Sequence, residues 1–496
     1  MVRFAAYIIC AIALWAGADS LAWAKLTTVS GRAKGYAGRV IVMRAEKDPV
    51  SHMTYDLSSA EVQPDGSFTF EADIKEVTHA FIDLSFYEAH IFLEPGARYV
   101  ATLPPFKLRP DAERFNPFYQ PKVINLTLTS ASSDLNQSLR KFDNDFGRIY
   151  LTQAVRMVRS RDKGLADAVI ARLDSAARAT GCQSAFFRQH VEYRKAEVYA
   201  TPRLQAPRSV IAKYFAGKPV AFNVPAYWRA LDILGADVAK RCAKMKAGWQ
   251  YETIMQGQDH DGARAMVGLL AADSLLMRSQ ALCEVLTLKS IRDNFFESQL
   301  SDGRTDTLLV SAARDFSAKR VRLMAANVYA SKNKLKAGLP APAFNLVDND
   351  DREISLATFK GRFLYLCFMH SENYECVKAM PVLENLAQVH RADMDVLCVF
   401  TDDEADDLYK RLAKTSHTWR AVSWIAWQRI LEDYEVRGLP TYFLIDPDGC
   451  ISISQAPGPS ENVGPAIAEC VRRYKVISQK GRTEVPRTIY DIANGN

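Results

Sequence analysis

Apolar and polar positions alternate along the first part of the chain and predict β-strands. Between residues 25 and 105, runs such as SFTFEAD, HAFIDLSF and HIFLEPG show the two-residue period of half-buried strands. Turn sequences such as Pro64-Asp65-Gly66 separate them. This spacing predicts an antiparallel β-sandwich over residues 25–105. The proline-rich stretch that follows cannot hold one regular element throughout, so residues 106–129 are interpreted as a linker.

The hydrophobic period changes to that of helices between residues 130 and 332. Ser132-Ser133-Asp134 resembles an N-cap cluster, and apolar residues then recur at three- or four-residue steps. Several prolines between residues 202 and 225 divide the region into short helices. Aromatic residues at helical spacing, Trp228 and Trp249 among them, are expected to lie in the core rather than to form a cofactor site.

A third pattern runs from residue 338 to residue 475. The sequences FLYLCF, DVLCVF and TYFLID are apolar throughout, as buried strands are, and amphipathic helical stretches alternate with them. One of these helices is expected to kink or restart at Pro381. Such alternation predicts an α/β unit with some parallel strand pairing. The fold class is therefore multidomain α+β and α/β, with residues 476–496 as a C-terminal tail.

The first 24 residues are expected to be a signal peptide. Arg3 precedes an almost wholly apolar stretch over residues 4–18, and Ala22-Trp23-Ala24 fits the pattern that a signal peptidase cleaves. An uncleaved anchor is the alternative, but the stretch is shorter than the ~20 residues of a membrane span. We therefore expect a mature chain from Lys25, exported to the periplasm or cell envelope, with no stable membrane span.

Charge and cysteine spacing exclude several classes of function. The formal charge is +6, from 63 basic and 57 acidic residues that are interspersed, which argues against nucleic acid as a partner. Eight of the nine cysteines follow the predicted signal peptide, and none has C-x-x-C or zinc-ligand spacing. No metal site and no cofactor are expected, and the sequence leaves disulfide pairing open.

Four motifs carry a resemblance to a known family. They are Gly338–Phe344 (GLPAPAF), the segment from Ile354 to Gly361, Cys376–Pro381 (CVKAMP) and Val436–Thr441 (VRGLPT). In this order they resemble the thioredoxin-like disulfide reductases of bacterial envelopes, and the whole chain resembles long Bacteroidetes-type members with an N-terminal β domain and a helical insert. The resemblance implies a thioredoxin fold over residues 338–475 and a cis peptide bond between Leu439 and Pro440, beside the redox site.

The chain departs from that family at its redox motif. The family's C-x-x-C would place the nucleophilic cysteine three residues before Cys376, and that position holds Asn373. Dithiol exchange needs an exposed thiolate of low pKa at a helix N-terminus and a second thiol to resolve the mixed disulfide. The amide of Asn373 cannot supply the first thiolate, although it can cap the helix. The motif is therefore interpreted as degenerate.

Two functions of different classes follow. The first is a binding or scaffolding protein, in which Asn373, Leu439 and Pro440 line a groove that holds an envelope protein or an extended peptide segment by backbone pairing. The second is a thiol-disulfide oxidoreductase or peroxiredoxin-like peroxidase that uses Cys376 as its catalytic residue. A further alternative is that Cys367 or Cys450 replaces the missing partner. The sequence leaves open whether the chain is an enzyme.

Overall fold

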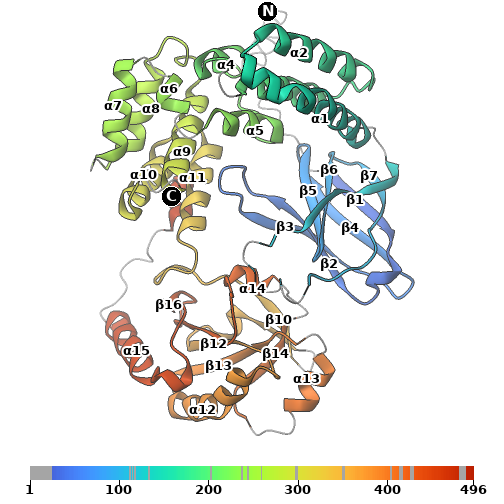
Figure 1. The fold of residues 1–496 in the computed structure, drawn as a ribbon. Helices are drawn as coiled ribbons and strands as arrows, with labels where there is room; N and C mark the ends of the chain where they lie inside the picture. Colours follow the sequence, from blue (N-terminus) through green and yellow to red (C-terminus); the bar gives the residue numbers. More distant parts are fainter. Residues whose placement is uncertain are drawn as a thin grey trace, which may run out of the picture.

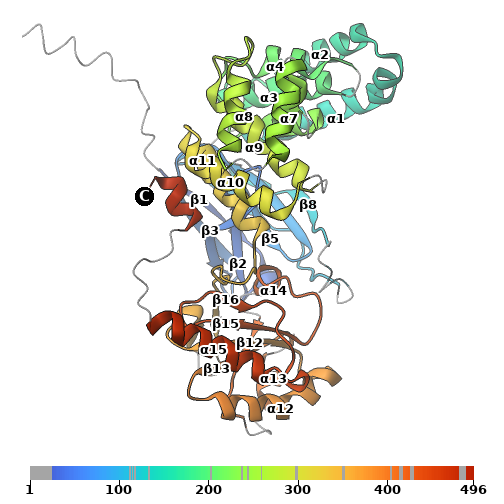
Figure 2. The same ribbon diagram turned by 90° about the vertical axis from the view of Figure 1, so that its left-hand side faces the viewer.

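The computed structural model describes residues 25–110, 113, 116, 119–131, 135–201, 204–235, 238–242, 245–257, 260–296, 300–348, 352–402, 405–412, 417–424, 429–479 and 488–495. The predicted signal peptide and the predicted N-cap cluster at residues 132–134 lie outside these residues. Three parts follow one another along the long axis of the molecule, with the helices at one end, the C-terminal α/β part at the other and the β part between them (Figures 1 and 2).

The β part consists of two sheets with the strand orders β4-β1-β7-β9 and β3-β2-β5-β6-β8. Inward side chains of both sheets, including Phe70, Ile82 and Tyr99, form one apolar core. The strands are β1 (Lys25–Arg32), β2 (Val40–Glu46), β3 (Thr54–Glu61), β4 (Ser67–Ile74), β5 (Thr78–Leu84), β6 (Tyr87–Leu93), β7 (Arg98–Thr102), β8 (Lys122–Asn125) and β9 (Thr127–Ala131).

Two expectations for this part need correction. Most neighbouring strands are antiparallel, but β1 pairs with β7 and β6 pairs with β8 in parallel. The expected linker at 106–129 also contains β8 and the start of β9, which complete the edges of the two sheets. The strand β8 begins directly after Pro121, since proline lacks the N–H that a strand ladder uses. The sheet part therefore extends to Ala131.

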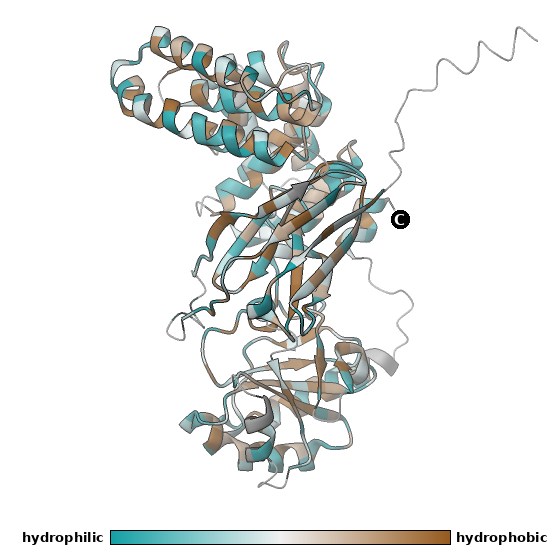
Figure 3. Cartoon of the chain, turned by 90° about the vertical axis from the view of Figure 1, so that its right-hand side faces the viewer, coloured by the Kyte–Doolittle hydropathy of each residue, from teal (hydrophilic) through white to brown (hydrophobic). Residues whose placement is uncertain are grey.

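The helical part shares one continuous core, coloured green to yellow in Figure 1. Trp228 is buried in this core as expected, whereas the side chain of Trp249 is 70% exposed, which contradicts the expectation for that residue. In Figure 3 the helices carry both teal and brown residues, as is expected of helices that pack one face against a core and turn the other to solvent. The helices are α1 (Leu135–Ser160), α2 (Lys163–Arg178), α3 (Ala185–Ala200), α4 (Pro207–Tyr214), α5 (Pro225–Leu234), α6 (Val238–Cys242), α7 (Met245–Gln256), α8 (Gly262–Ala271), α9 (Gln280–Phe296), α10 (Asp302–Asp315) and α11 (Lys319–Lys332).

The expected C-terminal tail also carries structure. Its first residues belong to α15 (Gly464–Gln479), and a short helix, α16 (Ile489–Asn494), packs against α10 and α11 of the helical part. Ala493 is fully buried there, and the carbonyl oxygen of Ala493 accepts a hydrogen bond from Arg322 at 2.8 Å. A helix of six residues is unstable alone, so α16 exists because of this packing.

The C-terminal part is built on one five-stranded sheet of order β14-β13-β12-β15-β16. The strands β12, β13 and β14 are parallel, whereas β15 and β16 are antiparallel to their neighbours. The elements are β10 (Asn345–Val347), β11 (Glu353–Ser355), β12 (Phe363–Met369), α12 (Tyr374–His390), β13 (Met394–Phe400), α13 (Ala405–Leu412), β14 (Arg420–Ser423), α14 (Ile430–Asp433), β15 (Thr441–Ile445), β16 (Ile451–Ile453) and α15.

Alternate residues of β12 enter two different cores. Tyr365 and Cys367 pack on the face that α12 and α15 contribute to, whereas Leu366 and Phe368 pack on the face that α14 contributes to. All seven residues of β12 are buried, because helices cover both faces of the sheet. This explains why the strand is apolar throughout and why the end of β12 is firmly positioned.

The helix α14 connects the C-terminal part to the β part through ion pairs. Arg429, directly before α14, lies 2.9 Å from Asp56 of β3, and the guanidinium of Arg109 lies 3.3 Å from the carboxylate of Glu432 (Figure 1). The Nζ of Lys334 donates to the backbone oxygen of Glu432 at 2.9 Å. These contacts fix one face of the C-terminal sheet against the rest of the molecule.

Within the described part of the chain, no helix combines the length and the apolar character needed to cross a lipid bilayer.

Candidate functional site

The candidate site lies where β12 ends and α12 begins. Residues 370–373 connect the two elements, and the register of β12 with β15 places Thr441 opposite Phe368. Pro440 directly precedes Thr441, so it lies at the same end of the sheet as this connection. The Leu439–Pro440 peptide bond is cis, the conformation that the motif implies. The structure therefore brings together the expected site residues Asn373, Cys376, Leu439 and Pro440.

Asn373 is the N-cap of α12. Its backbone is extended, and its side-chain oxygen accepts hydrogen bonds from the N–H groups of Glu375 at 3.0 Å and Cys376 at 3.2 Å. The first N–H groups of a helix have no partner within the helix, and an asparagine cap satisfies them. Where the family's nucleophilic sulfur would lie, this chain holds a neutral amide that already uses the N–H groups which would stabilise a thiolate.

Cys376 lies one turn into α12 and is fully buried. Burial raises the pKa of its thiol to about 11, and the nearby charge of Asp402 acts in the same direction. A hydrogen bond with the backbone of His370 acts in the opposite direction but is smaller than the effect of burial. The side chain therefore lacks both the exposure and the ionisation that a nucleophilic thiol requires.

Two further thiols share the core beneath α12. Cys367 of β12 and Cys398 of β13 are register partners on adjacent parallel strands, both fully buried and in the same apolar cluster as Cys376. All three are free thiols. Burial raises the pKa of Cys367 well above its usual value. These thiols pack as small apolar side chains and are not presented to solvent.

Cys450 cannot replace the missing partner. It follows β15 at the opposite end of the sheet, where Ile445 pairs with Leu364 at the start of β12. Its N–H donates to the side chain of Asp446 at 2.9 Å within the turn before β16. The whole length of β12 separates this turn from Asn373.

A buried carboxylate, Asp402, holds the loop before α12, and the sequence analysis did not identify it. Its side chain is 2% exposed and accepts a hydrogen bond from the N–H of Ser371 at 3.0 Å and a second, short one from the Ser371 hydroxyl. The Nδ1 of His370 accepts the N–H of Glu372 at 3.2 Å. A carboxylate placed after a buried parallel strand, as in DVLCVFTD, was the available indication.

The hydroxyl of Ser371 donates to this carboxylate and not to the imidazole of His370. A serine nucleophile needs a neighbouring base that accepts its proton and is itself oriented by a third group. In this loop the imidazole accepts a backbone N–H instead. The arrangement of Asp402, Ser371 and His370 therefore shapes the loop and does not form a hydrolytic triad.

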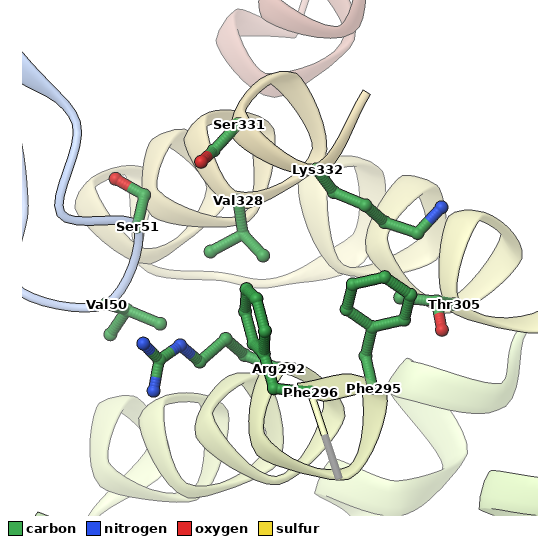
Figure 4. A pocket seen from close by; sticks show the side chains of 9 residues that line it. All are labelled: Val50, Ser51, Arg292, Phe295, Phe296, Thr305, Val328, Ser331 and Lys332. Carbon is green, nitrogen blue, oxygen red and sulfur yellow. The ribbon is translucent and has the colours of Figure 1, made fainter. Parts of the chain in front are cut away.

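A small cavity lies elsewhere, between the β2–β3 turn and helices α9, α10 and α11 (Figure 4). Its volume of about 30 Å³ has room for a water molecule, not for an organic ligand. The cations at its wall are already paired, since Lys332 lies 2.9 Å from Asp306 and Arg292 lies 2.9 Å from Asp293. Among the described residues, no group of three histidine, cysteine, aspartate or glutamate side chains is arranged to hold a metal ion.

A five-stranded sheet of this order, with a helix that begins beside a cis-proline, defines a thioredoxin-like domain. Residues 336–469 match the Redoxin family. The chain is 31% identical over 121 residues to the thiol-disulfide oxidoreductase ResA of Bacillus thuringiensis strain Al Hakam, which covers 24% of this chain and 70% of that protein. It is 27% identical over 122 residues to ResA of Bacillus subtilis strain 168, covering 25% and 68%.

Solved structures show similarity to part of the chain. The thioredoxin domain of a thiol-disulfide oxidoreductase from Bacteroides vulgatus is 24% identical, covers 27% of this chain and 97% of that chain, and has a TM-score of 0.26. A thiol:disulfide interchange protein from Bacteroides sp. is 25% identical, covers 28% and 92%, and has a TM-score of 0.26. On the sequence matches, the chain belongs to the family of thioredoxin-like thiol-disulfide oxidoreductases.

Proposed function

We propose that this protein uses its thioredoxin-like domain to bind an extended peptide segment and does not catalyse dithiol exchange. The single observation that carries the proposal is the N-cap of α12, where the amide of Asn373 occupies the position of the family's nucleophile and accepts the N–H groups of Glu375 and Cys376. A site that keeps the capped helix and the cis-proline retains its shape without its sulfur chemistry.

The surface around the cap suits an extended partner. Tyr374 is 75% exposed, Arg437 and Gly438 are exposed, and Leu439 and Pro440 are half-buried beside the cap. The loop before β15 can pair its backbone with an extended chain while neighbouring side chains contact alternate residues of that chain. The partner we propose is an extended segment of an envelope protein.

Disulfide-reduction assays test the absence of exchange chemistry. The wild-type protein is expected to reduce insulin disulfides no faster than a protein-free control, because with a pKa of about 11 only about one Cys376 thiol in ten thousand is ionised at pH 7. Asn373→Cys is expected to gain measurable reduction, since it restores two sulfurs at C-x-x-C spacing within disulfide reach. Glu372, which would raise the pKa of a neighbouring thiol, should keep that activity below the level of the cysteine-containing relatives.

Matched variants separate the alternatives. Asn373→Ser keeps a capping oxygen but no sulfur and should remain inactive, and Cys376→Ser combined with Asn373→Cys should stop at the mixed disulfide. In the native wild type, Cys376 should react with a small alkylating agent only after unfolding. Strong wild-type turnover that Cys376→Ser abolishes would overturn the binding proposal and establish a single-cysteine oxidoreductase.

Export is part of the same proposal. The strand β1 begins at Lys25, directly after the expected cleavage point, so removal of residues 1–24 leaves every described strand of both sheets in the mature chain. We expect N-terminal sequencing of protein isolated from the cell envelope to begin at or near Lys25. A membrane-embedded form that begins at Met1 would contradict this expectation.

A further inference from the structure

The outer face of α1 combines exposed aliphatic and basic side chains. Leu151 is 68% exposed and Val155 is 62% exposed, and they lie one turn apart on the same face of the helix. Arg148 and Arg159 extend this face at the same spacing, and Arg156 lies beside it. This combination is typical of amphipathic helices that lie on membrane surfaces, in which cationic side chains flank an apolar centre.

The positive charge is concentrated where α1 turns into α2. Residues 145–163 contain five basic and two acidic residues, a net charge of +3, which is half of the net charge of the whole chain. Arg156, Arg159, Arg161 and Lys163 are all exposed, and none of them forms an ion pair with a described residue. We call Leu151, Val155 and these four cations the α1 patch.

The two acidic residues form no ion pair with the four cations of the patch. Asp145 lies 2.6 Å from Arg148, at the far side of the exposed aliphatic pair. Asp162 is the N-cap of α2, and its side chain accepts the N–H of Leu165 at 3.2 Å. The four cations of the patch therefore face solvent without an ion-pair partner among the described residues.

The backbone at Arg161 adds an independent observation. This residue ends α1 with a φ of +53°, a left-handed conformation that favours glycine. A bulky side chain in this conformation costs free energy that glycine would avoid, and such positions gather at functional sites. The chain nevertheless holds an arginine whose guanidinium lies in the α1 patch.

Helix electrostatics alone do not account for the patch. Cations near the C-terminus of α1 interact favourably with the helix dipole, and this explains the positions of Arg159 and Arg161. Lys163 lies in the first turn of α2, where the dipole disfavours a cation. The dipole also gives no reason for Leu151 and Val155 to be exposed.

We propose that the α1 patch docks the protein on an anionic phospholipid bilayer. Leu151 and Val155 enter the boundary between headgroups and acyl chains, and the four cations contact phosphate groups around them. The aliphatic pair favours a bilayer over a nucleic acid, because phosphate contacts alone need no exposed leucine. The patch lies at the end of the molecule opposite the thioredoxin-like domain (Figures 1 and 2), so docking leaves the cis-proline site uncovered.

Vesicle co-sedimentation tests the proposal on the full-length mature protein. Binding is expected to vesicles that mix phosphatidylglycerol with phosphatidylcholine and not to pure phosphatidylcholine, and high salt should weaken it. The triple variant Arg156→Gln, Arg159→Gln, Arg161→Gln should bind on the order of 100-fold more weakly. Leu151→Ser with Val155→Ser should weaken binding roughly tenfold.

A charge-matched control distinguishes the patch from general charge. Lys75→Gln, Lys319→Gln, Lys360→Gln removes the same number of exposed cations elsewhere and should bind as the wild type does. Circular dichroism checks that every variant is folded, which is expected because all substituted side chains are exposed. Any of three results would overturn the proposal. They are equal binding to both kinds of vesicle, unchanged binding by the α1-patch variants, and binding to a single-stranded oligonucleotide in place of vesicles.

Discussion

His79 lies in a half-buried polar cluster between the β part and the helical part. Its Nε2 is 2.8 Å from Nδ1 of His90, and its ring stacks on Phe92 with 4.6 Å between centroids. Burial lowers the pKa of His79 to about 3, and the charges of His90, Arg229 and His190 act in the same direction. At pH values between about 6.5 and 3, the imidazole is therefore neutral in the folded protein, whereas the same histidine in the unfolded chain is protonated.

This environment predicts a pH-dependent loss of stability. The unfolded chain binds a proton at His79 near pH 6.5 and the folded protein only near pH 3, so stability is complete above pH 6.5 and falls as the pH drops towards 3. Between pH 8 and pH 5 the free energy of unfolding should fall by about 2 kcal/mol through this one group. His79→Gln, whose amide does not titrate and can still accept from His90, should remove that part of the loss in urea titrations.

A second histidine provides the control. The hydrogen bond that the His52 imidazole donates to the carboxylate of Glu46 raises the pKa of His52, so His52 contributes stability at low pH that is lost as the pH rises. His52→Gln should therefore leave the acid-side loss in place. The measurement stays above pH 5 so that Asp143 does not contribute. Burial alone would raise the pKa of Asp143, but the hydrogen bonds and charges of His190 and Arg194 lower it, so protonation of Asp143 reduces the stability of the protein only in stronger acid. An unchanged pH profile in His79→Gln would contradict the argument.

At the same scale, some site residues were predictable and others were not. Asn373, Cys376 and Pro440 could be found because each occupies a fixed place in a short motif with local geometry, a helix cap and the start of a strand. For Asp402 the sequence indicated only a carboxylate after a buried strand, since its role depends on the hydrogen bond that it accepts from Ser371, 31 residues away in the chain. Cys376 is buried because it lies one turn inside α12, on the face of the helix that packs against the sheet.

At the scale of elements, helices and strands could be predicted where their hydrophobic pattern is strong. The strands β12, β13 and β15 are apolar runs buried on both faces, and their sequences leave no alternative period. The short strands β8 and β9 were missed because they have four and five residues and follow a proline-rich stretch, so only pairing with strands already present defines them. Local sequence predicts a strand only where its residues favour a strand whatever the neighbouring strands are.

The helix α12 differs from one part of its prediction. A kink or restart was expected at Pro381, and the structure shows no restart, because α12 is one helix from Tyr374 to His390 with Pro381 inside it. Proline removes one hydrogen bond from a helix interior, but the inner face of α12 is anchored on both sides of Pro381, by Cys376 and Ala379 before it and by Leu383 after it. Burial along the whole inner face outweighs the loss of that one bond.

At the scale of the whole molecule, the thioredoxin-like domain is held at both ends. The chain enters it from α11 and, after α15, returns to the helical part, where α16 packs on α10 and α11 (Figure 1). The hydroxyl of Tyr490 in α16 donates to Asn327 at 3.0 Å, and the amide of Asn327 donates to Asp48 of the β part at 2.8 Å. Two consecutive hydrogen bonds thus join α16 to α11 and, through α11, to the turn between β2 and β3.

Removal of residues 480–496 should therefore loosen the helical part and not the domain that precedes the cut. Losing the buried Ala493 and the half-buried Ile489 and Ile492 should cost about 3 kcal/mol of local stability. Hydrogen exchange should become faster at amides of α10 and α11 while those of β12 stay protected. Tyr490→Phe, which removes only the hydrogen bond to Asn327, should cost about 1 kcal/mol and serves as the matched control. If the hydrogen exchange rates of α10 and α11 do not change after truncation, these helices are stable without α16. The packing of α16 would then not hold the C-terminal end of the thioredoxin-like domain to the helical part.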